Sequence, residues 1–130
     1  MSDESAAIHR SLSASVVAVD WKEDLRALRA SDSYHTANHS AKTLAKHPAL
    51  TVVLVAMKSD GSMEEHHADS AITVHCLEGR FHFTVDGTAH ELDPGQMLLV
   101  TERLPHSVQA VEECAFLLTI GEQHHTEASE

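Results

Sequence analysis

Beyond residue 50, the chain alternates short apolar runs with clusters of turn residues. The runs are rich in Val, Ile, Leu and Phe, and within 80–86 apolar and polar positions alternate strictly. Strands at such short and regular spacing predict an all-β sandwich or barrel. The pair Asp86-Gly87 between two alternating runs predicts a tight hairpin. The expected strands cover residues 50–57, 71–78, 80–86, 88–92, 96–101, 106–112 and 114–120.

The N-terminal part of the chain has a different pattern. Residues 1–15 are small and polar, which predicts a loose arm. Trp21, Leu25 and Leu28 then recur at the spacing of one helical face, and Asp20 is placed to cap a short helix. We expect this apolar stripe to dock on the domain or on a second subunit. The chain is accordingly divided into an N-terminal arm with a short helix (1–35), a barrel domain (36–121) and a disordered tail (122–130).

Charge narrows the range of partners. The 130 residues are 42% hydrophobic, enough for one globular domain, and 20 acidic against 9 basic side chains give a formal net charge of −11. A surface this acidic repels nucleic-acid phosphates and anionic membrane surfaces, so we expect neither as a partner. No apolar stretch reaches the ~18 residues that cross a bilayer. The first residues also lack the pattern of a secretory signal, so we expect a cytoplasmic protein.

Candidate chemistry concentrates in EEHHADSAITVHCLEGR, residues 64–80. The adjacent His66 and His67 are candidate metal ligands. Because residues of the same parity face the same side of a strand, an inward His66 predicts that His67 and His75 point away. His67 reaches inward only if a bulge or loop resets the alternation.

The residues that follow this stretch resemble the second conserved motif of the cupin superfamily. In GQMLLVTERLPH, Gly95 precedes His106 at the spacing of that motif, although Thr101 and Arg103 stand where the family often has Pro and Gly. HCLEGR, with Gly79, resembles the end of the first cupin motif, and the hairpin between the two resembles the usual link. This resemblance, over residues 50–120, implies an RmlC-like cupin jelly-roll barrel (a double-stranded β-helix) with an internal pocket.

The resemblance also implies a set of metal ligands. In metal-binding cupins the first motif supplies two histidines separated by one residue and then a glutamate, and the second motif supplies a third histidine. Counting back from Gly79, the family positions fall on His66, Ala68 and Ile72, and His106 matches the second motif. Two of the four ligands are therefore present. His67 or a nearby carboxylate from Glu64, Glu65 or Asp69 is the candidate that completes a site for one divalent transition metal (Fe, Mn, Ni or Zn).

Two functions of different classes follow. The first is a small-molecule-binding cupin with a reduced metal site on His66, His106 and His67. The second is a metal-free, non-catalytic cupin that serves as a ligand-binding or structural module; neither hypothesis assigns a reaction. The resemblance and the Trp21 stripe together predict a homodimer. The expected pocket lining is Ile72, Val74, Cys76, Met97 and Leu99.

Overall fold

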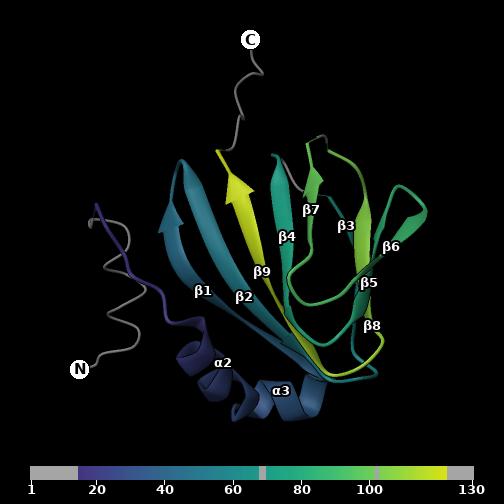
Figure 1. The fold of residues 1–130 in the computed structure, drawn as a ribbon, viewed down its shortest axis with the longest axis horizontal. Coiled ribbons are helices and arrows are strands. Elements are labelled where there is room, and N and C mark those ends of the chain that lie inside the picture. Colours follow the sequence, from purple (N-terminus) through teal and green to yellow (C-terminus); the bar gives the residue numbers. More distant parts are fainter. Residues whose placement is uncertain (1–14, 68–69, 102, 123–130) are drawn as a thin grey trace.

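The computed structural model describes residues 15–67, 70–101 and 103–122. Two antiparallel sheets face each other, and two short helices pack outside the larger one (Figure 1). Strand order is β1-β2-β9-β4-β7 in the five-stranded sheet and β3-β8-β5-β6 in the four-stranded sheet. The elements are α2 (Trp21–Arg29), α3 (Asp32–Ala37), β1 (His39–His47), β2 (Leu50–Met57), β3 (Ser62–His66), β4 (Ile72–Glu78), β5 (Phe81–Val85), β6 (Thr88–Leu92), β7 (Met97–Val100), β8 (His106–Ala110) and β9 (Cys114–Gly121).

The expected all-β fold is confirmed, and each strand predicted beyond residue 50 is present within two residues of its expected ends. The hairpin at Asp86-Gly87 is confirmed as well: both residues have positive φ (49° and 85°), as a tight two-residue turn between twisted strands requires. Strands β1 and β3 and helix α3 were not predicted. In β1 only Leu44 is buried, so the strand carries no clear apolar alternation.

Helix α2 forms where the apolar stripe predicted it. The carboxylate of Asp20 accepts a hydrogen bond from the Glu23 amide at the first turn, which satisfies one of the unpaired amides there. Leu25 and Leu28 are buried against the outer face of the five-stranded sheet, and Trp21 packs beside them. The stripe therefore covers the domain's own sheet. Expectations for residues 1–14 and 123–130 fall outside the described residues.

The main core lies between the two sheets. It is built from the inward side chains of both sheets, with three phenylalanines as its largest members. Among the described residues, no helix is long and apolar enough to span a membrane. The buried members of the core are Val55, Met57, Ile72, Val74, Cys76, Phe81, Phe83, Leu92, Val100, Val108, Ala110, Cys114 and Phe116.

Strand β7 faces the opposite way from the sequence prediction. Met97 and Leu99, expected to line the pocket, are 53% and 62% exposed, whereas Val100 is buried in the core. Residues directly opposite on antiparallel strands share a face, and Leu99 lies opposite Thr73 on the outer face. The prediction was wrong because all four residues of β7 are apolar, so the alternation offers no polar face to turn outward.

Candidate two-histidine site

His66 and His106 meet although 40 residues separate them in the sequence. Strand β3 pairs with β8 so that the two histidines are direct cross-strand partners, after a register shift between Met63 and His66. Their Nε2 atoms lie 3.1 Å apart, and the rings cross edge to face at a centroid distance of 4.3 Å. The irregularity in β3 thus sets the position from which His66 reaches its partner.

Backbone carbonyls fix the protonation of both rings. The Nδ1 atom of His66 lies 3.1 Å from the Glu64 carbonyl oxygen, and that of His106 lies 3.2 Å from the Leu104 carbonyl oxygen. A carbonyl can only accept, so each Nδ1 carries a proton and donates it. In the neutral rings both Nε2 atoms then hold lone pairs that face each other, and either a shared proton or a metal ion between them would satisfy both.

The spacing of the two nitrogens fits one metal ion. Two histidine nitrogens at about 2.1 Å from the same ion lie about 3.0 Å apart at a right angle and about 3.4 Å apart at the tetrahedral angle. The observed 3.1 Å falls between these values. Metal-binding histidines also donate their other N–H to a carbonyl or carboxylate, as His66 and His106 do. The pair therefore fits two cis ligands of a metal ion.

The environment of His106 favours its neutral form. The side chain is 4% exposed and stacks on Phe83, with ring centroids 5.3 Å apart. Burial, followed by the charge of His66, lowers the pKa of His106 below its ordinary value, and this outweighs the opposing hydrogen bond to the Leu104 carbonyl. Neutral imidazole is the form that binds a metal. His66, by contrast, is exposed at the end of β3, so the pair has one buried and one open side.

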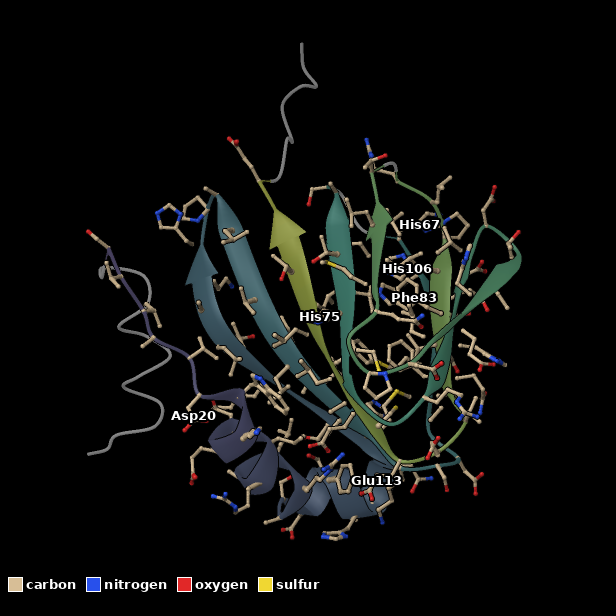
Figure 2. All side chains as sticks on the ribbon, viewed as in Figure 1. Asp20, His67, His75, Phe83, His106 and Glu113 are labelled. Carbon is tan, nitrogen blue, oxygen red and sulfur yellow. The ribbon has the colours of Figure 1, made fainter. Side chains whose placement is uncertain are left out.

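His67 lies near the pair without joining it. It follows β3, is exposed, and is close enough for its charge to lower the pKa of His106. Figure 2 shows His67, His106 and Phe83 grouped together, with His75 apart from them. Within the described ranges, no group of three or more His, Cys, Asp or Glu side chains is placed to hold a metal ion. Of the carboxylates considered, Glu64 and Glu65 are exposed on β3, and Asp69 lies outside the described residues.

His75 lies on the outer face of β4, as parity predicted. Its cross-strand partners are Leu117 of β9 and Met97 of β7. Leu117 packs against the cluster beneath the helices, which places this row of side chains outside the barrel. His75 is therefore remote from the His66–His106 pair and serves as a natural control for it.

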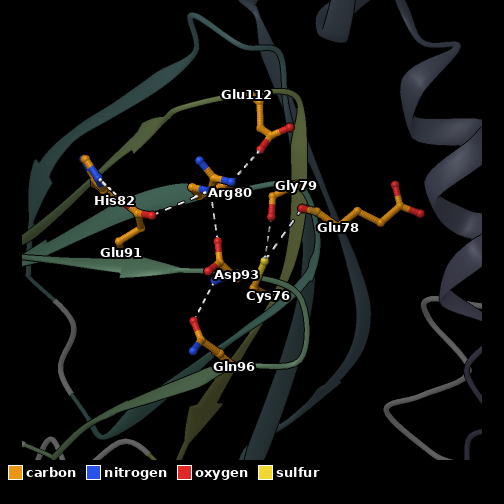
Figure 3. A network of polar contacts seen from close by, with 9 residues as sticks. All are labelled: Cys76, Glu78, Gly79, Arg80, His82, Glu91, Asp93, Gln96 and Glu112. Carbon is orange, nitrogen blue, oxygen red and sulfur yellow. Dashed lines mark hydrogen bonds and ion pairs between the residues drawn. The ribbon is translucent and has the colours of Figure 1, made fainter.

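Of the expected pocket lining, Ile72, Val74 and Cys76 do point inward. All three are buried members of the core between the sheets. The thiol of Cys76 lies within hydrogen-bonding distance of the Glu78 and Gly79 carbonyls (Figure 3). Burial, followed by the charge of Asp93, raises the pKa of this thiol to about 11, so Cys76 stays protonated and contributes no thiolate ligand.

Arg80 organises a polar network that the sequence did not reveal. Its guanidinium lies 3.0 Å from the Asp93 carboxylate, 3.6 Å from that of Glu91 and 3.7 Å from that of Glu112 (Figure 3). Glu91 and Asp93 lie at the end of β6, whereas Glu112 lies in the turn between β8 and β9, so no local motif predicts the cluster. The network is exposed, and it ties the turn after β4 to the ends of β6 and β8. We assign it a structural role.

A shallow groove of about 510 Å³ lies on the other side of the five-stranded sheet, between α2 and the end of β4. Two of its basic residues are already paired: Arg26 with Glu23, and Arg29 with Glu78. The charges that could attract an anion are thus largely neutralised within the chain. The lining residues are Lys22, Leu25, Arg26, Arg29, Ala30 and Glu78.

Comparison with known proteins identifies the family. The sequence model of the cupin domain matches residues 52–125, more than half of the chain. The chain belongs to the cupin family. This cupin has no match among curated proteins. The resemblance inferred from Gly79, Gly95 and His106 is therefore confirmed, and with it the cupin jelly-roll fold.

Solved structures agree on the fold of this cupin. An RmlC-like cupin from Shewanella frigidimarina is 17% identical with a TM-score of 0.62, over 71% of this chain and 83% of that one. KdgF from a Halomonas species is also 17% identical with a TM-score of 0.60, over 69% and 85% of the two chains. Salicylate 1,2-dioxygenase from Pseudoaminobacter salicylatoxidans, solved as adducts with gentisate, is 16% identical with a TM-score of 0.69, over 79% of this chain but 32% of that one.

Proposed function

We propose that this cupin binds one divalent transition metal ion through the Nε2 atoms of His66 and His106, and a small molecule beside it. The observation that supports this is the pair of facing Nε2 atoms 3.1 Å apart, on rings whose Nδ1 atoms each contact a backbone carbonyl. Fe, Mn, Ni and Zn all accept imidazole nitrogen. Such an ion would supply Lewis acidity to a small molecule.

His106, His66 and His67 have different roles in the proposed site. His106 is the rigid ligand, because Phe83 stacks on its ring and the surrounding core keeps it dry. His66 is the exposed ligand on the solvent side, where a small molecule enters. His67 is the candidate third ligand, since its charge reaches His106. Buried apolar residues behind the pair exclude water from that side.

Specific observations also support a second function, in which no metal is bound. A metal-free cupin that serves as a ligand-binding or structural module is favoured by Ala68 and Ile72, which replace two family ligands. It is also favoured by the absence of a third donor in place among the described residues. The two functions differ in a measurable way, since only the first requires a bound metal.

The deciding experiment is elemental analysis of untagged protein, followed by titration of the metal-free protein with Zn²⁺, Mn²⁺, Fe²⁺ and Ni²⁺. We expect one site whose affinity falls at least ~10-fold in both His66→Ala and His106→Ala. His75→Ala, an outward histidine on the same barrel, is the matched control and should bind as the wild type does. Sub-stoichiometric metal that is unchanged in His106→Ala would overturn the proposal and favour the alternative.

A further inference from the structure

The proposed metal site has one open side. His106 is 4% exposed, whereas His66 is open to solvent at the end of β3. Among the described residues, no third His, Cys, Asp or Glu side chain is placed with this pair to hold a metal ion. Zinc sites in proteins usually have at least three protein ligands. The open side beside His66 is therefore where a further protein ligand would reach the ion.

Strand β9 ends at the same end of the barrel as this site. Ile72, at the start of β4, pairs with Ile120 of β9 on one side and with Val100 of β7 on the other. The last residues of β9 and β7 therefore lie together where β4 begins, at the top of Figure 1. We call this edge of the five-stranded sheet, defined by Ile72, Val100 and Ile120, the upper rim.

Two short connections bring the histidine pair to the upper rim. His66 ends β3, and residues 67–71 lead from it to β4. His106 begins β8, and residues 101–105 lead to it from β7. An extended chain spans at most about 3.5 Å per residue, so each histidine lies within roughly 20 Å of the rim. Figure 2 shows His106 in the upper part of the barrel, toward this rim.

Hydrogen bonds fix the point at which the chain leaves β9. The Gly121 amide donates to the Ala71 carbonyl at 2.9 Å, and the Ser70 hydroxyl donates to the Gly121 carbonyl at 3.2 Å. Ser70 is buried, so its contact with Gly121 is enclosed in the folded chain. Ser70 and Ala71 belong to the connection that follows His66. The chain thus leaves β9 against the same connection that carries His66.

Two adjacent histidines follow this point closely. His124 and His125, which lie outside the described residues, come three and four residues after Gly121. Ala71, which contacts Gly121, is five residues from His66 and therefore at most about 18 Å from it. Four residues span up to about 14 Å, and the imidazoles that would meet at the ion add to this reach. Both histidines are therefore close enough to the open side of the site.

We propose that a histidine of this segment, His124 or His125, is a ligand of the metal ion held by His66 and His106 of the same chain. The inference rests on the proposed metal site and adds a ligand to it. Neighbouring residues of an extended segment point to opposite sides, so one of the two histidines faces the ion. A ligand on so short a tether has an effective concentration in the millimolar range, far above that of a second copy of the chain.

The test is Zn²⁺ titration of the full untagged chain, with a chelating indicator as competitor. We expect the double substitution His124→Ala/His125→Ala to lower Zn²⁺ affinity at least ~10-fold, because it removes a nitrogen ligand. Each single substitution should cost less, since the neighbouring histidine can take its place. The matched control is Gln123→Ala/Thr126→Ala, which changes only the flanking residues and should bind as the wild type does. Unchanged affinity in the double variant would overturn the inference.

The pattern of variants separates this inference from the proposed function. If Zn²⁺ affinity falls in His66→Ala and His106→Ala but not in His124→Ala/His125→Ala, the inference is wrong and the proposed function stands. In a chain that lacks both His66 and His106, we expect the double substitution to have no measurable effect, because ligands of one ion act together. An effect as large there as in the wild type would mean that the segment binds Zn²⁺ by itself, and the inference would be wrong.

Mixing two variants tests whether the ligand comes from the same chain. One variant carries His124→Ala/His125→Ala, and the other carries His66→Ala/His106→Ala with both later histidines intact. A mixture at about 10 μM of each should bind Zn²⁺ no more tightly than the first variant alone, because the tether between site and ligand is lost. Restored affinity would mean that a second copy supplies the ligand, and this too would contradict the inference.

Discussion

His106 and His66 face each other across β8 and β3 with their Nε2 atoms 3.1 Å apart, and each donates its Nδ1 proton to a backbone carbonyl. Of the four ligand positions in the metal-binding cupin pattern, this chain thus has histidine at two, and the fold brings these two side chains together. Ala68 and Ile72 remove the other two. The proposed site is therefore tested best by the effect of a metal ion on the stability of the folded chain.

Metal should stabilise the fold through both histidines. A metal present at about 100 times its dissociation constant should raise the free energy of unfolding by about 2.7 kcal/mol, because it binds only the folded pair. Chemical denaturation with Zn²⁺ and then with excess EDTA measures the gain and its reversal. The gain should vanish in His66→Ala and persist in His75→Ala; a gain retained in His66→Ala would contradict the assignment.

Stability without metal should depend on pH through His106. The folded-state pKa of this residue is lowered from its ordinary value of 6.5, so below that value the unfolded chain binds the proton more readily. The contribution of neutral His106 is therefore complete above pH 6.5 and is lost as the pH falls toward the folded-state pKa. Urea unfolding in EDTA at pH 7.5 and 5.5 should show a larger acid loss in the wild type than in His106→Gln. Equal losses of unfolding free energy in the two proteins would contradict the assignment of this pH dependence to His106.

Phe83 should affect metal affinity, whereas its neighbour Phe81 should not. Both are buried, but Phe83 stacks on His106 and Phe81 packs on Phe116. Replacing either by Leu leaves an imperfectly filled core and should cost about 1–2 kcal/mol of stability. Only Phe83→Leu should also weaken metal binding several-fold, because the His106 ring loses its support. Calorimetric titration with a metal ion compares the two variants directly. Equal metal affinities in both would show that Phe83 does not position His106.

Gly79, the residue that anchors the first cupin motif, should tolerate no side chain. Its φ is +75°, and a Cβ there would lie 2.0 Å from the Glu113 carbonyl oxygen. Gly95→Ala is the matched control, because Gly95 also has positive φ (+91°) but open space around it. We expect Gly95→Ala to cost about 1 kcal/mol of backbone strain and Gly79→Ala at least ~3 kcal/mol. Chemical denaturation measures both, and equal costs would show that the close approach is unimportant.

Local patterns predicted the elements whose signals are local. The β-branched run 50–57 became β2, Asp86-Gly87 became a hairpin, and Asp20 became the cap of α2. Each depends on residues within a few positions of one another. The same patterns did not predict β1 or α3. Packing of Leu44 and Tyr34 against the rest of the molecule stabilises those two, and neighbouring residues give no sign of that packing.

The sequence alone determined the cupin fold, the candidacy of His66 and His106, and the outward direction of His75. It could not determine how β7 is oriented, because alternation in a fully apolar strand is equally consistent with either face. Nor could it place His67, because a register shift in β3 breaks the parity count. Tertiary structure decided these points: pairing with β4 turned Met97 and Leu99 outward, and pairing with β8 brought two nitrogens to 3.1 Å. Register between distant strands is a property of the whole sheet, so only the assembled sheet sets it.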